Sequence, residues 1–166
     1  MTSTAMRAIR VGMALLLLAP TISSGQSSDD ERALAQLVQR WAAARNANDA
    51  DAMRPLFDQR VDQVRLNDGE VIASDQDGVV RWFDAGFKRE RQALTAVVDS
   101  TRARLLSSDT GLVDYSFKLR GADGKATTNG HVTFVCVKRG ADWKVIALRF
   151  ASSTPEARAD APRGEP

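Results

Sequence analysis

Hydrophobic side chains after residue 28 recur every three or four positions, which is the spacing of one face of an α-helix. The residues that carry this pattern are Leu34, Leu37, Val38 and Trp41. Ser28 and Glu31 have the spacing of a capping box, in which the hydroxyl caps the helix and the carboxylate reaches back. We therefore predict a helix that begins at Ser28 and runs to about Arg45.

Capping residues predict two further helices. Asp49 or Asp51 is placed to cap a short helix that ends near Phe57. A second capping signal, Ser-Asp-Gln-Asp at 74–77, opens a third helix that ends with two basic residues, where cations suit the helix dipole. The apolar side of this third helix holds Val79, Trp82, Phe83 and Phe87.

Beyond Arg91 the hydrophobic period changes from helical to alternating, which is typical of β-strands. Four successive strands are predicted over 94–105, 112–119, 125–138 and 143–152. An earlier strand over 61–66 turns at Asn67-Asp68-Gly69 into Val71 and Ile72, a strong hairpin signal. Helices followed by a long antiparallel meander indicate an α+β domain.

The first 25 residues have the pattern of a secretory signal peptide. Two arginines, Arg7 and Arg10, precede an apolar run over 11–19, and small residues follow at 23–25. This run is too short to be a permanent membrane anchor. We expect cleavage near Gly25 and a secreted or periplasmic protein with no membrane attachment thereafter. The mature domain is expected over 26–153, and a polar, disordered tail over 154–166.

Composition narrows the classes of partner. The chain has 23 Lys and Arg against 21 Asp and Glu, and the leader holds two of the arginines and no acid, so the mature chain has 23 − 2 = 21 basic residues against 21 acidic ones. No basic stripe remains for nucleic acid. With one Cys, Cys136, and one His, His131, neither an intramolecular disulfide nor a spaced His/Cys metal site is expected. We expect no metal and no other cofactor.

The order helix, helix, strand, strand, helix and four strands resembles the nuclear transport factor 2-like superfamily, which includes SnoaL-like and ketosteroid isomerase-like proteins. The resemblance covers about residues 30 to 152. Its local carriers are the Trp41 helix leading into Asn48-Asp49, the Asp68-Gly69 hairpin, Gly78-Val79-Val80, and Gly130…Val132-Thr133 leading to Trp143-Lys144-Val145-Ile146.

The resemblance implies a cone in which three N-terminal helices pack in a strongly curved, mostly antiparallel sheet of about six strands. The wide end of the cone is then a pocket, which members have adapted to isomerisation, dehydration, cyclisation, hydrolysis, binding or dimerisation. Fold alone therefore does not decide the function.

The chain departs from the isomerase members at two places. Their Tyr on the first helix corresponds to Trp41, which has no phenol. Many small members end on Trp-x-Ile-Val-x-x-His-x-Ser, and here Arg149 and Ala151 stand at the His and Ser positions. A standard isomerase is therefore disfavoured, although Asp62 or Asp68 remains available as a carboxylate.

Two charged residues are candidates for the pocket. Strand alternation places Arg149 on the same face as Trp143 and Val145, where its guanidinium would anchor an anion; alternatively it pairs with a surface acid at the sheet margin. Asp62 lies near the start of the first strand, where family members often place a catalytic carboxylate. An Asp62–Arg149 ion pair that closes an inert pocket is the alternative to a catalytic pair.

The remaining candidates are one imidazole and several rings. His131 is the only side chain whose ordinary pKa suits proton transfer near neutral pH, but a position just after Asn129-Gly130 is also ordinary for an exposed His. Tyr115 is a candidate hydroxyl near the pocket or a core residue. Three further rings, Trp41, Trp82 and Phe83, line the pocket or fill the core.

These residues lead to a main hypothesis and its rivals. The first is an apolar pocket that binds a small organic molecule, with proton-transfer or hydration chemistry by Asp62 and His131 and positioning by Arg149 and Tyr115. The main rival is a non-catalytic module with a filled pocket, which forms a homodimer or another protein interface through the open face of the sheet. An immunity-type protein that inhibits a partner is the third.

Overall fold

The structure of the protein, a computed structural model, describes residues 24–90 and 94–154. The predicted signal peptide lies almost entirely outside the described residues, and so does the predicted tail after Thr154.

The helices follow the capping residues, with one exception. They are α1 (Ser24–Asn46), α2 (Ala50–Met53), the 3₁₀ turn η1 (Arg54–Leu56) and α3 (Gln76–Arg89). The caps predicted before the second and third helices are confirmed, since Asp49 accepts a hydrogen bond from the Ala52 amide and Asp75 from the Gly78 amide. The predicted start at Ser28 is wrong, because the helix already begins at Ser24 and a local capping pattern does not exclude an upstream turn.

Six strands form one sheet in the described residues. They are β1 (Phe57–Arg65), β2 (Val71–Ala73), β3 (Thr95–Leu105), β4 (Thr110–Arg120), β5 (Ala126–Arg139) and β6 (Asp142–Ser153). Their order across the sheet is β2-β1-β6-β5-β4-β3. Only β1 and β6 run parallel, and the other neighbours are antiparallel. The predicted α+β class and the mostly antiparallel sheet are confirmed.

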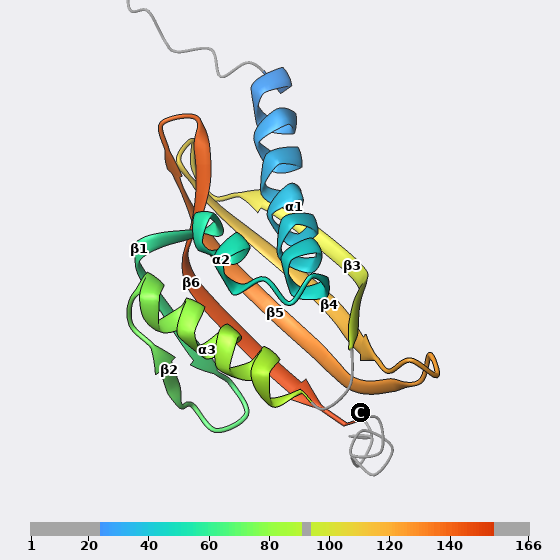
Figure 1. Ribbon diagram of the computed structural model, residues 1–166. Helices are drawn as coiled ribbons and strands as arrows, with labels where there is room; N and C mark the ends of the chain where they lie inside the picture. Colours follow the sequence, from blue (N-terminus) through green and yellow to red (C-terminus); the bar gives the residue numbers. More distant parts are fainter. Residues whose placement is uncertain (1–23, 91–93, 155–166) are drawn as a thin grey trace, which may run out of the picture.

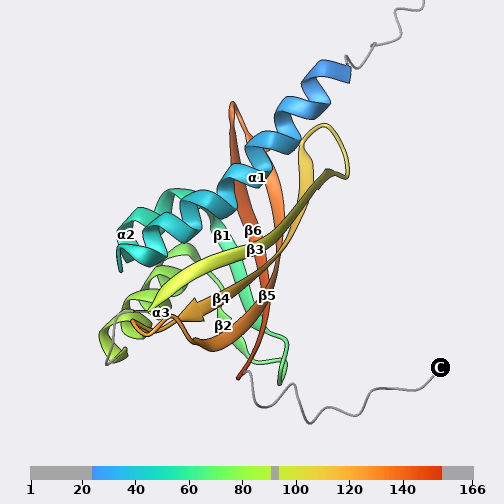
Figure 2. The same ribbon diagram turned by 90° about the vertical axis from the view of Figure 1, so that its right-hand side faces the viewer.

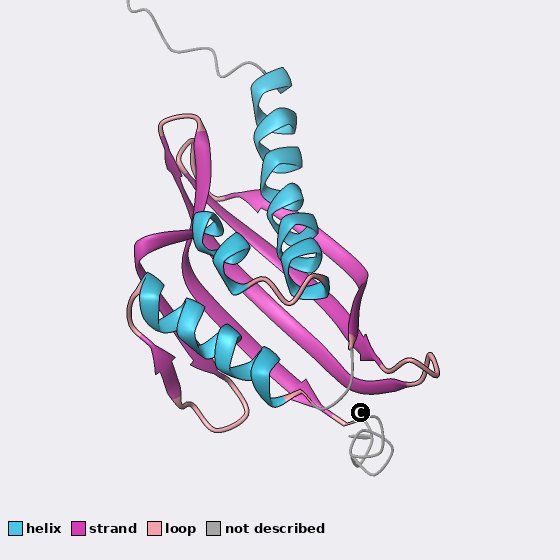
Figure 3. Cartoon of the chain, in the orientation of Figure 1, coloured by secondary structure: helices cyan, strands magenta, loops and turns pink. Residues whose placement is uncertain are grey.

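All the helices lie on one face of the bent sheet, which we call the inner face (Figures 1 and 2). Helix α1 crosses β3 and β4, and α3 packs against β1 and β2 (Figure 3). The core lies between the helices and this face. Among its buried members are Leu34, Leu37 and Val38 of α1, Val113 of β4, and Phe134 and Cys136 of β5. The opposite, outer face is covered by none of the described helices.

A β-bulge in β6 changes which side chains face the core. Cys136 of β5 pairs with Val145, but the preceding Val135 pairs with Ala147, so Ile146 is an extra residue in β6. An extra residue moves every later side chain to the other face. Leu148 therefore faces the core, 3% exposed. The prediction that Arg149 shares a face with Val145 is wrong, because strict alternation does not survive the bulge.

Candidate functional site

The inner face contains two neighbouring cavities between the sheet and helices α1 and α3. We call the first the outer cavity, although it too lies on the inner face of the sheet. Its volume is about 170 Å³. The residues that line it are Trp41, Arg45, Trp82, Phe83, Gly86, Phe87, Glu90, Phe117, Leu119, Thr128, Phe150 and Ser152. The second, the inner chamber, has a volume of about 60 Å³ and is lined by Trp41, Gln63, Trp82, Phe83, Tyr115, Phe117, Val132, Leu148 and Phe150. Five aromatic residues belong to both linings, so the two cavities share their walls.

Aromatic rings from four elements make up these walls. The Trp41 ring of α1 lies 5.0 Å from Phe117 and 5.3 Å from Tyr115, both on β4, measured between ring centroids. Trp82 of α3 lies 5.4 Å from Phe150 of β6 in the same measure. The two β4 rings face the same way because they are two residues apart on one strand. Their packing produces a mainly apolar lining.

The inner chamber also collects unpaired polar groups. Within the described part of the chain, four buried side-chain nitrogen or oxygen atoms have no hydrogen-bond partner: Trp41 Nε1, Gln63 Nε2, Gln63 Oε1 and Tyr115 Oη. All three residues line the inner chamber. They are deeply buried, with Gln63 0%, Tyr115 1% and Trp41 4% exposed. A buried polar group without a partner costs about 1–3 kcal/mol, so such a cluster calls for an explanation.

The residues that line the inner chamber carry no formal charge. The nine residues that line the inner chamber include no Asp, Glu, Lys, Arg or His. Burial raises the pKa of the Tyr115 phenol well above its ordinary value, so the hydroxyl stays protonated at neutral pH. The chamber therefore offers neutral hydrogen-bonding groups only.

A charged pair lies at the outer cavity instead. Arg45 is 4% exposed and forms an ion pair with Glu90, and both residues line this cavity. The Arg45 guanidinium also lies 4.9 Å from the centroid of the Phe87 ring, a cation–π arrangement. Its charge is thus balanced by one carboxylate and held against an aromatic wall.

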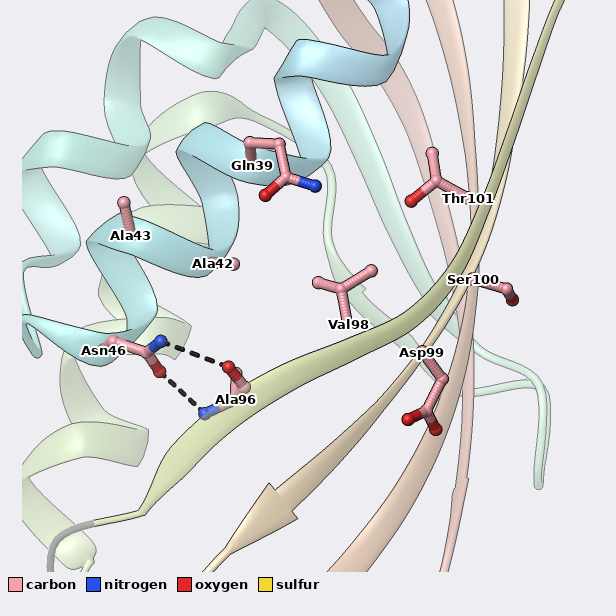
Figure 4. Close-up of a pocket in the computed structure, with 9 residues that line it drawn as sticks. All are labelled: Gln39, Ala42, Ala43, Asn46, Ala96, Val98, Asp99, Ser100 and Thr101. Atoms are coloured by element: carbon pink, nitrogen blue, oxygen red, sulfur yellow. Dashed lines mark hydrogen bonds between the residues drawn. The ribbon is translucent and has the colours of Figure 1, made fainter.

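A larger surface groove, of about 480 Å³, lies between α1 and the edge strand β3 (Figure 4). The Asn46 side chain spans it at one end: its amide nitrogen donates to the Ala96 carbonyl at 3.1 Å, and its oxygen accepts from the Ala96 amide at 2.7 Å. This amide pairs with the free edge of β3 as a neighbouring strand would. The contact joins α1 to the sheet.

The predicted site residues fall into two groups that lie on opposite faces of the sheet. Trp41, Trp82, Phe83 and Tyr115 line the inner chamber. Asp62, His131 and Arg149 line none of the three cavities described above. Arg149 Nη2 lies 2.6 Å from Asp62 Oδ2, with the two side chains 33% and 42% exposed, and His131 is exposed. The Asp62–Arg149 ion pair forms, but on the outer face of the sheet. The adjacent residues in the two strands, Gln63 and Leu148, are buried on the inner face, so alternation places Asp62 and Arg149 on the other side.

Gln63 is the site residue that the sequence analysis missed. It follows Asp62 in β1 and shares the inner face with the buried Val61. The signal was present, since alternation from Val61 places Gln63 toward the core, and a buried amide is uncommon enough to be informative.

Metal and thiol chemistry receive no support from the described residues. No group of three or more His, Cys, Asp or Glu side chains there is arranged to hold a metal ion. Burial raises the pKa of the Cys136 thiol to about 12, so it is not a reactive thiolate at neutral pH. No helix in the described ranges is both long and apolar enough to span a bilayer.

Comparison with known proteins agrees with this architecture. The sequence model of the SnoaL-like domain matches residues 34–150. The chain belongs to the SnoaL-like family. A search of curated proteins finds no match to this SnoaL-like chain.

Solved structures show the same fold at low sequence identity. A nuclear transport factor 2-like protein of unknown function from Pseudomonas putida has a TM-score of 0.67 at 13% identity, covering 75% of this chain and 87% of its own. Two proteins from Novosphingobium aromaticivorans are also similar. One, provisionally identified as a scytalone dehydratase, has a TM-score of 0.64 at 11% identity, covering 79% and 89%. The other, provisionally identified as an aromatic ring hydroxylase, has a TM-score of 0.64 at 18% identity, covering 80% and 97%.

Proposed function

We propose that this SnoaL-like protein binds a small organic molecule on the inner face of its sheet. The body of the ligand occupies the outer cavity, and one end enters the inner chamber. The observation that carries the proposal is the cluster of unpaired polar atoms on Trp41, Gln63 and Tyr115, all from residues of one chamber. A ligand with matching polar atoms would give these groups the partners that residues 24–90 and 94–154 do not supply.

The dimensions support a ligand of modest size. An apolar cavity of about 150 Å³ accommodates a benzene ring. The outer cavity, at about 170 Å³ and with aromatic walls, suits one ring or an equivalent aliphatic body. Apolar walls with a few polar groups are the usual composition of small-molecule sites. Two proteins of the same fold, provisionally identified as a scytalone dehydratase and an aromatic ring hydroxylase, are consistent with this class of ligand.

We propose binding without proton transfer. The predicted catalytic pair, Asp62 and His131, faces away from both inner-face cavities. A general base must lie within hydrogen-bond reach of the proton that it removes. Residues on the opposite face of a sheet do not meet this condition for a ligand bound among the rings.

We further propose that the first 25 residues direct export, so that binding takes place in the periplasm or outside the cell. Fractionation of cells that express the full chain tests this point. The expected result is a protein that begins near Gln26 in the exported fraction; a cytoplasmic protein that retains Met1 would contradict it.

The binding proposal is tested on mature protein purified from the exported fraction. Native mass spectrometry should reveal a non-covalent adduct that denaturation releases, or Trp fluorescence should report binding of at least one member of a panel of single-ring compounds. The matched control is His131→Gln on the outer face, which should bind in the same way. Mature protein with no adduct and no response to any panel member would overturn the proposal.

A homodimer is the second candidate, favoured by the outer face that the described helices leave uncovered (Figure 2). Leu112, Val135 and Ala147 pair in register across β4, β5 and β6 on this face and form a small apolar row. If two copies associate there, Val135→Glu should convert a dimer to a monomer in analytical ultracentrifugation. A wild-type protein that sediments as a monomer at all concentrations would exclude this candidate.

A further inference from the structure

We infer that the ligand group in the inner chamber is uncharged and carries both a hydrogen-bond donor and an acceptor, as a carboxamide does. This inference rests on the proposed function and specifies the class of ligand. The first step is the inventory of unpaired groups. Trp41 Nε1 only donates, the Tyr115 hydroxyl donates and accepts, and the Gln63 amide donates through Nε2 and accepts through Oε1.

The second step is the absence of charge among the lining residues. A carboxylate or ammonium placed in the inner chamber would leave water and meet no counter-ion, because none of the nine lining residues is charged. An unpaired ion in such surroundings is far more costly than an unpaired neutral dipole. The ionised pair Arg45–Glu90 lines only the outer cavity and balances itself.

The third step is complementarity of hydrogen bonding. A group that only accepts, such as a ketone, would leave Gln63 Oε1 unpaired, and a group that only donates would leave Trp41 Nε1 unpaired. A carboxamide offers N–H groups to Gln63 Oε1 and a carbonyl oxygen to the indole, amide or phenol donors. It therefore presents, on one planar head, a donor for Gln63 Oε1 and an acceptor for the unpaired donors.

The fourth step is size. The chamber, at about 60 Å³, is too small for a ring but large enough for a head group of three heavy atoms or for water. Water is the competing occupant, since it also donates and accepts. A ligand that inserts an apolar end would displace that water without replacing its hydrogen bonds, and would lose affinity. The comparison of a carboxamide with an apolar group of similar shape separates the two occupants.

Four single-ring probes test the inference: benzamide, benzoate and benzamidinium, which share a planar head of three heavy atoms, and ethylbenzene, which has a slightly smaller apolar substituent. Binding to the mature protein is measured by calorimetry and by tryptophan fluorescence, because two of the three tryptophans, Trp41 and Trp82, line both cavities. Benzamide should bind about tenfold more tightly than ethylbenzene, the equivalent of one to two net hydrogen bonds. It should exceed both ions by about a hundredfold, because of their desolvation.

Gln63→Leu provides a variant that keeps the fold. It has a similar volume and removes two unpaired atoms, so the protein should remain folded with an equal or higher melting temperature. The preference for benzamide over ethylbenzene should fall about tenfold in this variant. Asp62→Leu, the adjacent residue on the outer face, is the matched control and should leave the preference unchanged.

The outcomes distinguish the inference from the proposed function. If none of the four probes binds, ethylbenzene included, the proposed function fails. Should benzoate or benzamidinium bind as tightly as benzamide, the site exists but the uncharged head group is wrong, and the Arg45–Glu90 pair becomes the recognition element. If ethylbenzene binds as tightly as benzamide, the polar groups serve water and the carboxamide class is wrong.

Discussion

The two faces of the sheet treat polar side chains in opposite ways. On the outer face Asp62 pairs with Arg149 at 2.6 Å, and the Thr133 hydroxyl donates to Asp114 at 2.5 Å. On the inner face Gln63, next to Asp62 in the same strand, finds no partner among the described residues for either polar atom. Paired groups at a solvated surface need no further explanation. Unpaired groups at 0% exposure reduce stability, so they call for an explanation, which the proposed ligand provides.

The comparison also shows why charge was a poor guide to this site. Asp62, His131 and Arg149 were the residues with the most evident chemistry, and all of them lie outside the cavities. The residues that line the inner chamber are neutral. A charged side chain can act on a bound ligand only from within hydrogen-bond reach of it.

The largest loss of stability is expected from Gly130→Ala, which disturbs side-chain packing on the inner face. A Cβ at Gly130 would lie 2.2 Å from the Phe117 ring that walls both cavities, so the ring must move. Overpacking of this kind costs about 1–3 kcal/mol, and urea unfolding should show a lower midpoint at unchanged slope. Gly86→Ala on α3 is the matched control, since a Cβ there meets nothing within 4 Å. A Gly130→Ala protein as stable as wild type would contradict the packing of this wall.

The second prediction concerns the unpaired amide. Gln63→Leu should raise the free energy of unfolding by about 1–3 kcal/mol, because two buried atoms without partners are removed. Gln63→Glu, which has the same shape, should instead lower stability at neutral pH, since it buries an unpaired carboxylate. Denaturant titration of the ligand-free protein measures both. Loss of stability in Gln63→Leu would mean that the amide is already well solvated or bonded.

The third prediction uses the single tyrosine of the chain. Burial raises the pKa of Tyr115 above its ordinary value of 10.0, so the folded state binds a proton that the unfolded state releases. Stability from this source is complete below about pH 10 and falls as the pH rises further. Ultraviolet absorbance should show phenolate only as the protein unfolds, and Tyr115→Phe should lack this part of the alkaline decline. A phenolate signal from folded protein near pH 10 would place the hydroxyl in contact with solvent.

The smallest effect is expected on the outer face. Asp62→Asn removes an ion pair whose partners are 42% and 33% exposed, so the free energy of unfolding should change by about 1 kcal/mol or less and depend on salt. Probe binding should be unchanged in Asp62→Asn and in His131→Gln. If either variant loses probe binding, the separation of the two faces is wrong and the outer face holds the site.

Local sequence signals predicted most of the fold. Capping by Asp49 and Asp75 marked the starts of two helices, and the Asn67-Asp68-Gly69 turn marked the first hairpin. Such signals involve residues close in the chain, whose local preferences do not depend on tertiary contacts. Membership of the nuclear transport factor 2-like superfamily followed from the order of these elements, and the match to the SnoaL-like model confirms it.

The candidate site was only partly predictable. Trp41, Trp82, Phe83 and Tyr115 were candidates for the pocket or the core, which share residues in a cone-shaped fold, and all four line the inner chamber. Whether the polar atom of each ring has a hydrogen-bond partner depends on distances between separate elements of the fold. The unpaired indole and phenol therefore emerged only from the folded chain.

The sequence by itself determined the elements, their order and the family, because each of these follows from short-range periodicity and turn chemistry. Only the tertiary structure decided which side chains share the cavity. The extra residue Ile146 exists as a bulge only in relation to the register of β5, and it turns Arg149 outward and Leu148 inward. A period-two argument within one strand contains no information about its neighbour's register, so it cannot place the side chains that follow a bulge.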